Sequence, residues 1–161
     1  MKKVLLTLLT VCMVLPMASL PVYATPPTEV SGIFDVDVTV TGIRNAGPTL
    51  FIYGTDEEWW QGGLDGYVAE TEWVVRAYAS GRATFRSRYV FEGTVLGSET
   101  GTMEMQLLGQ QSAPGEWWYG TWEILGGTGG LANVHGQGVW WGPGMGNDPD
   151  HWYEGQVHFD P

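Results

Sequence analysis

Apolar and polar residues alternate with a period of two along most of the chain. Near the start of this pattern, Phe34, Val36 and Val38 fall on one side, while Asp35 and Asp37 fall on the other. Such a period, carried by β-branched and aromatic residues, predicts a half-buried β-strand. Further strands, separated by turn signals, are predicted at residues 50–53, 64–78, 83–96, 116–125, 136–141 and 152–159, with one more before the break at Pro114-Gly115.

The joint at residues 78–82 fits a three-residue hairpin loop, in which Gly81 takes the left-handed conformation. This loop predicts Trp73 opposite Ser87 and Ala69 opposite Phe91. The alternation then places these apolar residues inside: Trp73, Val75, Phe85, Tyr89 and Phe91. It places Glu70, Glu72, Arg86 and Arg88 outside as a ladder of cross-strand ion pairs, including Glu72 with Arg88.

The next turn is predicted as a loop of residues 97–99. This loop sets Phe91 opposite Met105, Gly93 opposite Met103 and Tyr89 opposite Leu107, so the inward face stays apolar. Residues 55–58, Thr-Asp-Glu-Glu, are interpreted as an acidic corner between two short strands.

No amphipathic helix of real length is predicted, and the class is all-β. Seven or eight antiparallel strands at this spacing indicate a sandwich or a barrel. A single antiparallel barrel formed by residues 25–161 is favoured, because no predicted strand carries the lysines or prolines that protect an exposed edge.

The first 24 residues have the pattern of a secretory signal peptide. A positive head at residues 1–3 precedes an apolar run at 4–15 and a small-x-small site at 22–24. We therefore predict cleavage near Ala24 and a secreted or periplasmic protein. The apolar run is shorter than a membrane span, and Cys12 lacks a lipoprotein box before it, so no membrane anchor is expected.

Charge limits the classes of partner. The formal net charge is −11 at pH 7, and removing residues 1–24 also removes both lysines. An acidic surface of this kind repels phosphate backbones and anionic lipids, so neither nucleic acid nor an anionic membrane surface is an expected partner. Cleavage also removes the single cysteine, which rules out disulfides and thiol chemistry.

Two groups of residues in the second half of the chain resemble a known family. They are Phe91-Glu92-Gly93-Thr94-Val95-Leu96-Gly97 and the run from Trp122 to Gly138 containing Gly126-Gly127-Thr128-Gly129-Gly130-Leu131-Ala132. They resemble a bacterial family of unknown function whose fold is similar to the allene oxide cyclase barrel and the dirigent proteins. The resemblance implies an eight-stranded barrel with a central cavity for a hydrophobic small molecule. No catalytic residue of the cyclases carries over to a position here.

Three motifs that might carry chemistry have simpler structural interpretations. The run 127–132 matches the dinucleotide fingerprint, but a strand follows where that motif needs a helix, so we interpret the glycines as a tight corner. Residues 147–151 offer too few hard ligands for Ca²⁺. His135, His151 and His158 lack zinc-ligand spacing, and His158 is expected to face solvent. No cofactor and no metal are predicted.

Aromatic residues occupy both faces of the later strands. Trp117 and Tyr119 alternate with Trp118 and Trp122, so one pair belongs outside the core. An outer aromatic set fits either an interface, including that of a homo-oligomer, or a stacking surface for a flat or sugar-like ligand.

Three functions from different classes follow. The favoured one is a non-catalytic protein that binds a small hydrophobic or aromatic ligand in the barrel interior or mouth. Its predicted lining is Trp73, Tyr89, Phe91, Met103, Met105, Trp118 and Trp122. The second is a cofactor-free cyclase or isomerase using Tyr67, Tyr89 or Glu104, and the third is an interaction or carbohydrate-binding module using Trp117, Tyr119 and Trp141. A cavity of at least ~300 Å³ without an ionisable group favours binding, and a buried carboxylate favours catalysis.

Overall fold

The computed structural model describes residues 26–143 and 151–161, which form eight strands and, within these ranges, no helix able to cross a membrane. The predicted signal peptide lies outside the described residues. The strands are β1 (Thr28–Ala46), β2 (Thr49–Gly62), β3 (Leu64–Tyr78), β4 (Ala83–Val95), β5 (Gly101–Gln111), β6 (Trp118–Gly129), β7 (Val134–Gly142) and β8 (His151–Phe159).

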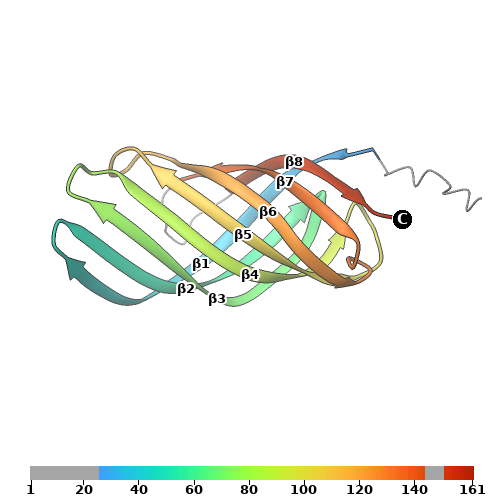
Figure 1. Ribbon diagram of the computed structural model, residues 1–161, viewed down its shortest axis with the longest axis horizontal. Coiled ribbons are helices and arrows are strands. Elements are labelled where there is room, and N and C mark those ends of the chain that lie inside the picture. Colours follow the sequence, from blue (N-terminus) through green and yellow to red (C-terminus); the bar gives the residue numbers. More distant parts are fainter. Residues whose placement is uncertain (1–25, 144–150) are drawn as a thin grey trace, which may run out of the picture.

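Each strand pairs antiparallel with its neighbours in the chain, and β1 also pairs with β8 (Figure 1). The pairing of β1 with β8 runs from Thr28↔Val157 to Phe34↔His151 and closes the sheet into one ring of eight strands. Closure removes the free edges that an open sheet would present. The prediction of an all-β fold with a single antiparallel sheet is therefore confirmed, with eight strands.

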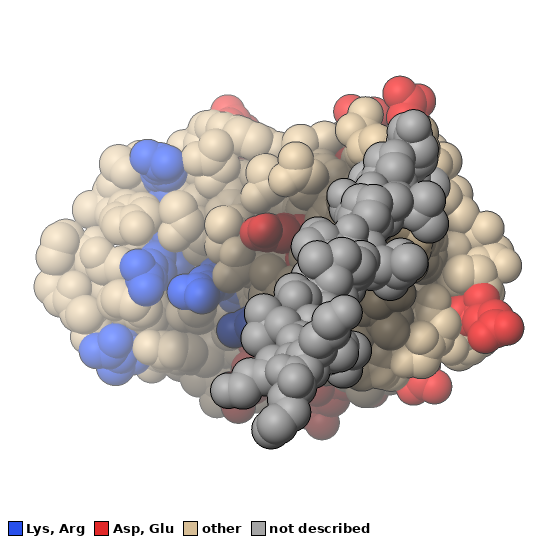
Figure 2. Space-filling model, turned by 45° about the vertical axis from the view of Figure 1, so that its right-hand side comes forward, with Lys and Arg blue, Asp and Glu red and all other residues tan. Residues whose placement is uncertain are grey.

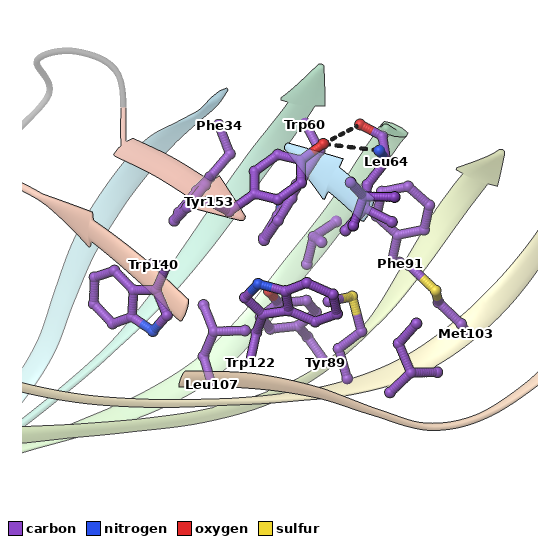
Figure 3. Packing of buried hydrophobic residues seen from close by; sticks show 14 of the residues in the cluster. Phe34, Trp60, Leu64, Tyr89, Phe91, Met103, Leu107, Trp122, Trp140 and Tyr153 are labelled. Atoms are coloured by element: carbon purple, nitrogen blue, oxygen red, sulfur yellow. Dashed lines mark hydrogen bonds between the residues drawn. The ribbon is translucent and has the colours of Figure 1, made fainter. Parts of the chain in front are cut away.

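The inward faces of the strands form one continuous core (Figure 3). All five residues that the hairpin prediction placed inside are buried: Trp73, Val75, Phe85, Tyr89 and Phe91. The four charged residues of the predicted ladder are exposed, as predicted. Burying each large apolar side chain contributes about 1.5–3 kcal/mol, so alternation on the long strands is sufficient to decide which face turns inward.

The predicted register of β3 and β4 is right near the turn and wrong further away. Trp73 lies opposite Ser87 as predicted, but Phe91 lies opposite Val68 and not opposite Ala69. Between Val68 and Trp73, β3 has one residue more than β4, and Ala69 and Glu70 are both exposed. This extra residue is a β-bulge, which shifts all pairs beyond it by one position.

The predicted register of β4 and β5 is wrong by two residues. Met103 lies opposite Phe91 and Met105 opposite Tyr89, and the loop spans residues 96–100, with Leu96 in a positive-φ conformation (54°). A shift by two positions keeps every side chain on its original face, so the apolar pattern fits both registers.

The interpretation of residues 55–58 as an acidic corner is also wrong. They lie within β2, where Asp56 pairs with Val38 and Glu58 with Val36 of β1. The side chains of Asp56 and Glu58 point inward with Trp60, and all three are buried.

The predicted ion pair of Glu72 and Arg88 is replaced by another. Arg88 Nε lies 2.5 Å from Glu104 Oε1 of β5, and Arg86 donates to Gln106 Oε1 at 3.4 Å.

On the face shown in Figure 2 the basic side chains gather on one half of the molecule, whereas most of the acidic ones lie on the other.

Candidate ligand-binding site

A cavity lies inside the ring, near the end that carries the β1–β2, β3–β4 and β5–β6 turns. Its walls come from seven strands and are mostly apolar or aromatic. The lining residues are Phe34, Val36, Val38, Asp56, Glu58, Phe85, Leu107, Trp118, Trp140 and His151. The volume of this cavity that the centre of a water molecule can occupy is about 40 Å³. One water needs ~10–15 Å³ by this measure, so the space holds about three waters.

The size threshold for a drug-sized ligand, ~300 Å³, is therefore not reached. The cavity fits a ligand of a few non-hydrogen atoms, or the end group of a longer molecule.

Two carboxyl groups form the polar part of this wall. The Asp56 side chain belongs to a residue only 3% exposed, and Glu58 is 1% exposed. They are two positions apart on β2, so both point inward, and they flank the point where the β2–β3 register shifts. Bulges are common beside functional sites, because they change the direction of a side chain.

The two groups differ in their hydrogen bonds. Trp60 Nε1 donates to Glu58 Oε2 at 2.7 Å. Asp56 Oδ1, by contrast, is buried without a hydrogen-bond partner. Neither carboxyl group forms an ion pair with an arginine of the described residues. Two acids thus share an apolar interior in which little compensates their charge.

Burial therefore changes the ionisation of these groups. Loss of hydration raises the pKa of Asp56 to about 7 and that of Glu58 to about 8, and the neighbouring Asp56 charge adds to the shift at Glu58. The pKa of Tyr89 is also raised, mainly by burial and then by the charges of Glu58 and Asp56. Burial thus favours the protonated form of both carboxyl groups near neutral pH.

Stacked rings support the cavity on the side of β1. Phe34 stacks on Trp60 at a centroid distance of 4.3 Å and on His151 at 4.9 Å. Trp140 packs edge-on against Phe85 at 5.9 Å, and its Nε1 donates to the Leu108 carbonyl at 3.0 Å. A Cβ on Gly109 would approach the Trp140 ring to 2.5 Å, so this glycine leaves the space that the indole fills.

All seven residues of the predicted lining are buried. Only Trp118 lines this cavity. Phe91 and Met103 pack beyond Tyr89 and Trp122 on the side away from Trp140 (Figure 3). Phe91 and Met103 belong to the close-packed part of the core, and a ligand role for them stays a prediction.

The three residues predicted as possible catalytic contributors have different surroundings. Tyr89 is buried beside the acid pair. Tyr67 is partly exposed against Trp59, and Glu104 faces outward to Arg88. Asp56 and Glu58, which line the cavity, are not among the site residues predicted from the sequence. Continuing the alternation from Trp60 back through residues 58 and 56 would have placed both inside, but no polar–apolar contrast marks residues 50–60 as a strand.

Comparison with solved structures finds the same fold in another protein. The chain is similar to a solved structure of a protein of unknown function from the DUF3224 family of Shewanella oneidensis MR-1. The TM-score is 0.67 at 22% identity, over 84% of this chain and 98% of the other. The fold is shared. No family model and no curated protein matches the chain. A particular likeness to allene oxide cyclases or dirigent proteins receives no support from these comparisons.

The outer aromatic set is present as well. Trp118 and Trp122 are buried, whereas Trp117 and Tyr119 are exposed. Tyr119 pairs with Trp141 across β6 and β7, and Trp141 pairs with Trp152 of β8. Trp117 and Trp152 stack with an interplanar angle of 1°. Whether this face meets a partner, a sugar or a second copy stays a prediction.

The glycine run at 127–132 ends β6 and turns into β7, as the corner interpretation predicted. Gly129 has φ 60°. A Cβ on Gly127 would approach the Leu131 carbonyl oxygen to 2.1 Å. His135 and His158 stack on the outer surface beside Asp160. No group of three metal-ligating side chains occurs among residues 26–143 and 151–161, and residues 147–150 of the considered Ca²⁺ loop lie outside the described residues.

Proposed function

We propose that this protein binds a small molecule in the cavity, where aromatic side chains contact its apolar part and Asp56 and Glu58 contact its polar part. The observation that carries this proposal is the pair of carboxyl groups in a cavity whose other lining residues, apart from His151, are apolar or aromatic. Burying a charged carboxylate costs several kcal/mol, and strongly perturbed acids in a cavity are typical of functional sites. A purely structural core would be more stable with apolar side chains at both positions.

A neutral probe tests whether the cavity is used. We expect tert-butanol to shift the indole N–H resonances of Trp118 and Trp140 in a saturable manner. Val38→Phe fills the cavity wall and should abolish the shifts. Val90→Phe, which adds the same bulk on the exposed face of β4, should leave them unchanged. Shifts that do not saturate, or that survive Val38→Phe, would overturn the proposal.

A second candidate is a cofactor-free isomerase or cyclase. It is supported by the acid pair, because a general acid or base works best with a pKa near the working pH. One carboxylate takes a proton from the substrate while the other carboxyl group returns one, so no co-reactant is needed. Small enones and unsaturated epoxides should then rearrange with the wild type and with Glu57→Gln, but not with Glu58→Gln. Equal turnover by Glu58→Gln would contradict this candidate.

We place this function outside the cytoplasm, because residues 1–24 have the pattern of a signal peptide. N-terminal sequencing of protein from the periplasm or the medium should begin at Thr25. A cytoplasmic protein that starts at Met1 would contradict export.

A further inference from the structure

The cavity contains two acids, and no arginine of the described residues forms an ion pair with either. Only 3% of the Asp56 surface is exposed, and its Oδ1 is buried in this interior without a hydrogen-bond partner. Glu58 accepts a 2.7 Å hydrogen bond from Trp60 Nε1, and the neutral hydroxyl of Tyr89 also faces it, so no charged donor of the described residues reaches the pair. Buried carboxylates in proteins are ordinarily paired or hydrogen-bonded, so a positive group from outside the chain would complete the site.

The rest of the wall is suited to the same kind of group. Phe34, Phe85, Trp118 and Trp140 line the cavity around the acids. Aromatic faces attract cations through the ring quadrupole, most strongly when the cation is desolvated, and rings of this kind recognise alkylated ammonium groups in other proteins. Lysine-like primary amines keep a tight hydration shell, whereas methylated ammonium groups lose theirs readily and present methyl groups to the rings.

We infer that the ligand is a small organic cation, with an alkylated ammonium group held between the aromatic walls and Asp56 and Glu58. This inference rests on the proposed binding function and specifies its ligand class. A space for about three waters excludes a large ring system and limits the buried part of the ligand to a small head group. A longer ligand would place only this head group in the cavity.

Other charged groups around the site do not remove the need for a cation. Tyr89 of β4 faces the pair and, with its raised pKa, stays neutral at physiological pH. His151 of β8 lines the same cavity and stacks on Phe34. The arginines of β1, β3 and β4 are exposed on the outer face, where salt screens their charge beyond roughly 8–10 Å.

Two probes of equal size separate charge from shape. Tetramethylammonium and tert-butanol each have five non-hydrogen atoms in a compact arrangement, and only the first is charged. Titration followed by tryptophan fluorescence and calorimetry should give at least tenfold tighter binding of tetramethylammonium at pH 8. Equal binding of both probes would overturn the cation inference and leave the proposed function standing. Binding of neither probe, nor of other small neutral compounds, would overturn both.

Matched variants locate the charge that matters. Asp56→Asn and Glu58→Gln should lower tetramethylammonium affinity about tenfold or more, toward that of tert-butanol, while tert-butanol binding changes little. Glu57→Gln removes the same charge from the outward-facing position between them and should leave both affinities unchanged. An equal loss with Glu57→Gln would show that only overall charge is involved and would contradict the site.

The pH dependence gives an independent readout. A cation favours the ionised carboxylates, so tetramethylammonium should bind more tightly at pH 9 than at pH 6, with protons released on binding in between. Tert-butanol should show no such dependence. Affinity that does not change from pH 6 to 9 would contradict a role for the buried acids.

Discussion

The indole N–H of Trp60 donates a 2.7 Å hydrogen bond to Oε2 of Glu58, two residues earlier on the same strand, and both residues are buried. The bond favours the ionised form of Glu58, whereas burial and the nearby Asp56 oppose it. The hydrogen bonds of Trp60 and Tyr89 to Glu58 do not bring its pKa back to its usual range. The ionisation of Glu58 therefore depends on its few neighbours inside the ring of strands.

Trp60→Phe removes this donor while keeping an aromatic ring. The pKa of Glu58 should rise further, and the protein should lose about 1–3 kcal/mol of unfolding free energy. The loss should be larger at pH 9, where Glu58 is ionised, than at pH 5, where it is protonated. Urea unfolding at both values measures this, and an equal loss at the two would show that only packing had changed.

Stability should fall as pH rises through the neutral range. The ordinary pKa values of Asp56 and Glu58 are 3.8 and 4.5, and burial raises them in the folded protein to about 7 and about 8. Between these limits the folded state binds more protons than the unfolded state, so raising the pH favours unfolding. From pH 5 to 9 we expect a loss of more than about 1 kcal/mol.

Glu58→Gln should flatten this dependence, and Glu57→Gln should leave it as in the wild type. Thermal unfolding at five pH values tests both. A wild-type stability that increases toward pH 9 would contradict the burial of ionisable carboxyl groups.

Tyr153 joins β8 to the turn between β2 and β3. Its hydroxyl accepts from Leu64 N at 2.8 Å and lies 3.1 Å from the Leu64 carbonyl oxygen, to which it donates (Figure 3). Tyr153→Phe leaves these buried backbone groups unsatisfied and should cost about 1–3 kcal/mol.

Tyr119→Phe is the control, because the Tyr119 hydroxyl is exposed and only reaches Ser112 at 3.3 Å. It should change stability by less than about 0.5 kcal/mol. Equal effects of the two substitutions in denaturant unfolding would refute the role of the buried hydroxyl.

Buried and exposed tryptophans in and beside β6 should differ sharply in their tolerance of substitution. Trp122→Ala removes a 1%-exposed side chain and should cost about 3–5 kcal/mol. Trp117→Ala removes an exposed ring that stacks on Trp152 and should cost about 0.5–1.5 kcal/mol. Chemical denaturation compares the two, and a similar cost would mean that the outer aromatic set is structural.

The candidate site could be predicted from the sequence only in outline. Tyr89 is predicted inside correctly because its strand alternates clearly, and Trp118 is also buried as predicted, although both faces of its strand carry aromatic residues. Asp56 and Glu58 are not predicted inside, because residues 50–60 carry aromatic and acidic residues on both faces and no period stands out. A run of three acidic side chains in four positions is usually solvated, and only the pairing of β2 with long neighbours on both sides keeps this one inside a strand.

The sequence by itself determined which side chains of the clearly alternating strands face inward. Residue parity is a local property, and burying one large apolar side chain outweighs most competing local preferences. Only the tertiary structure decided how the strands align. The two-residue offset of β5 against β4 preserves parity, the bulge between Val68 and Trp73 depends on both neighbours of β3, and the pairing of β1 with β8 joins the two ends of the described chain. Those long-range pairings also brought two acids on β2 against aromatic rings from β4, β6 and β7.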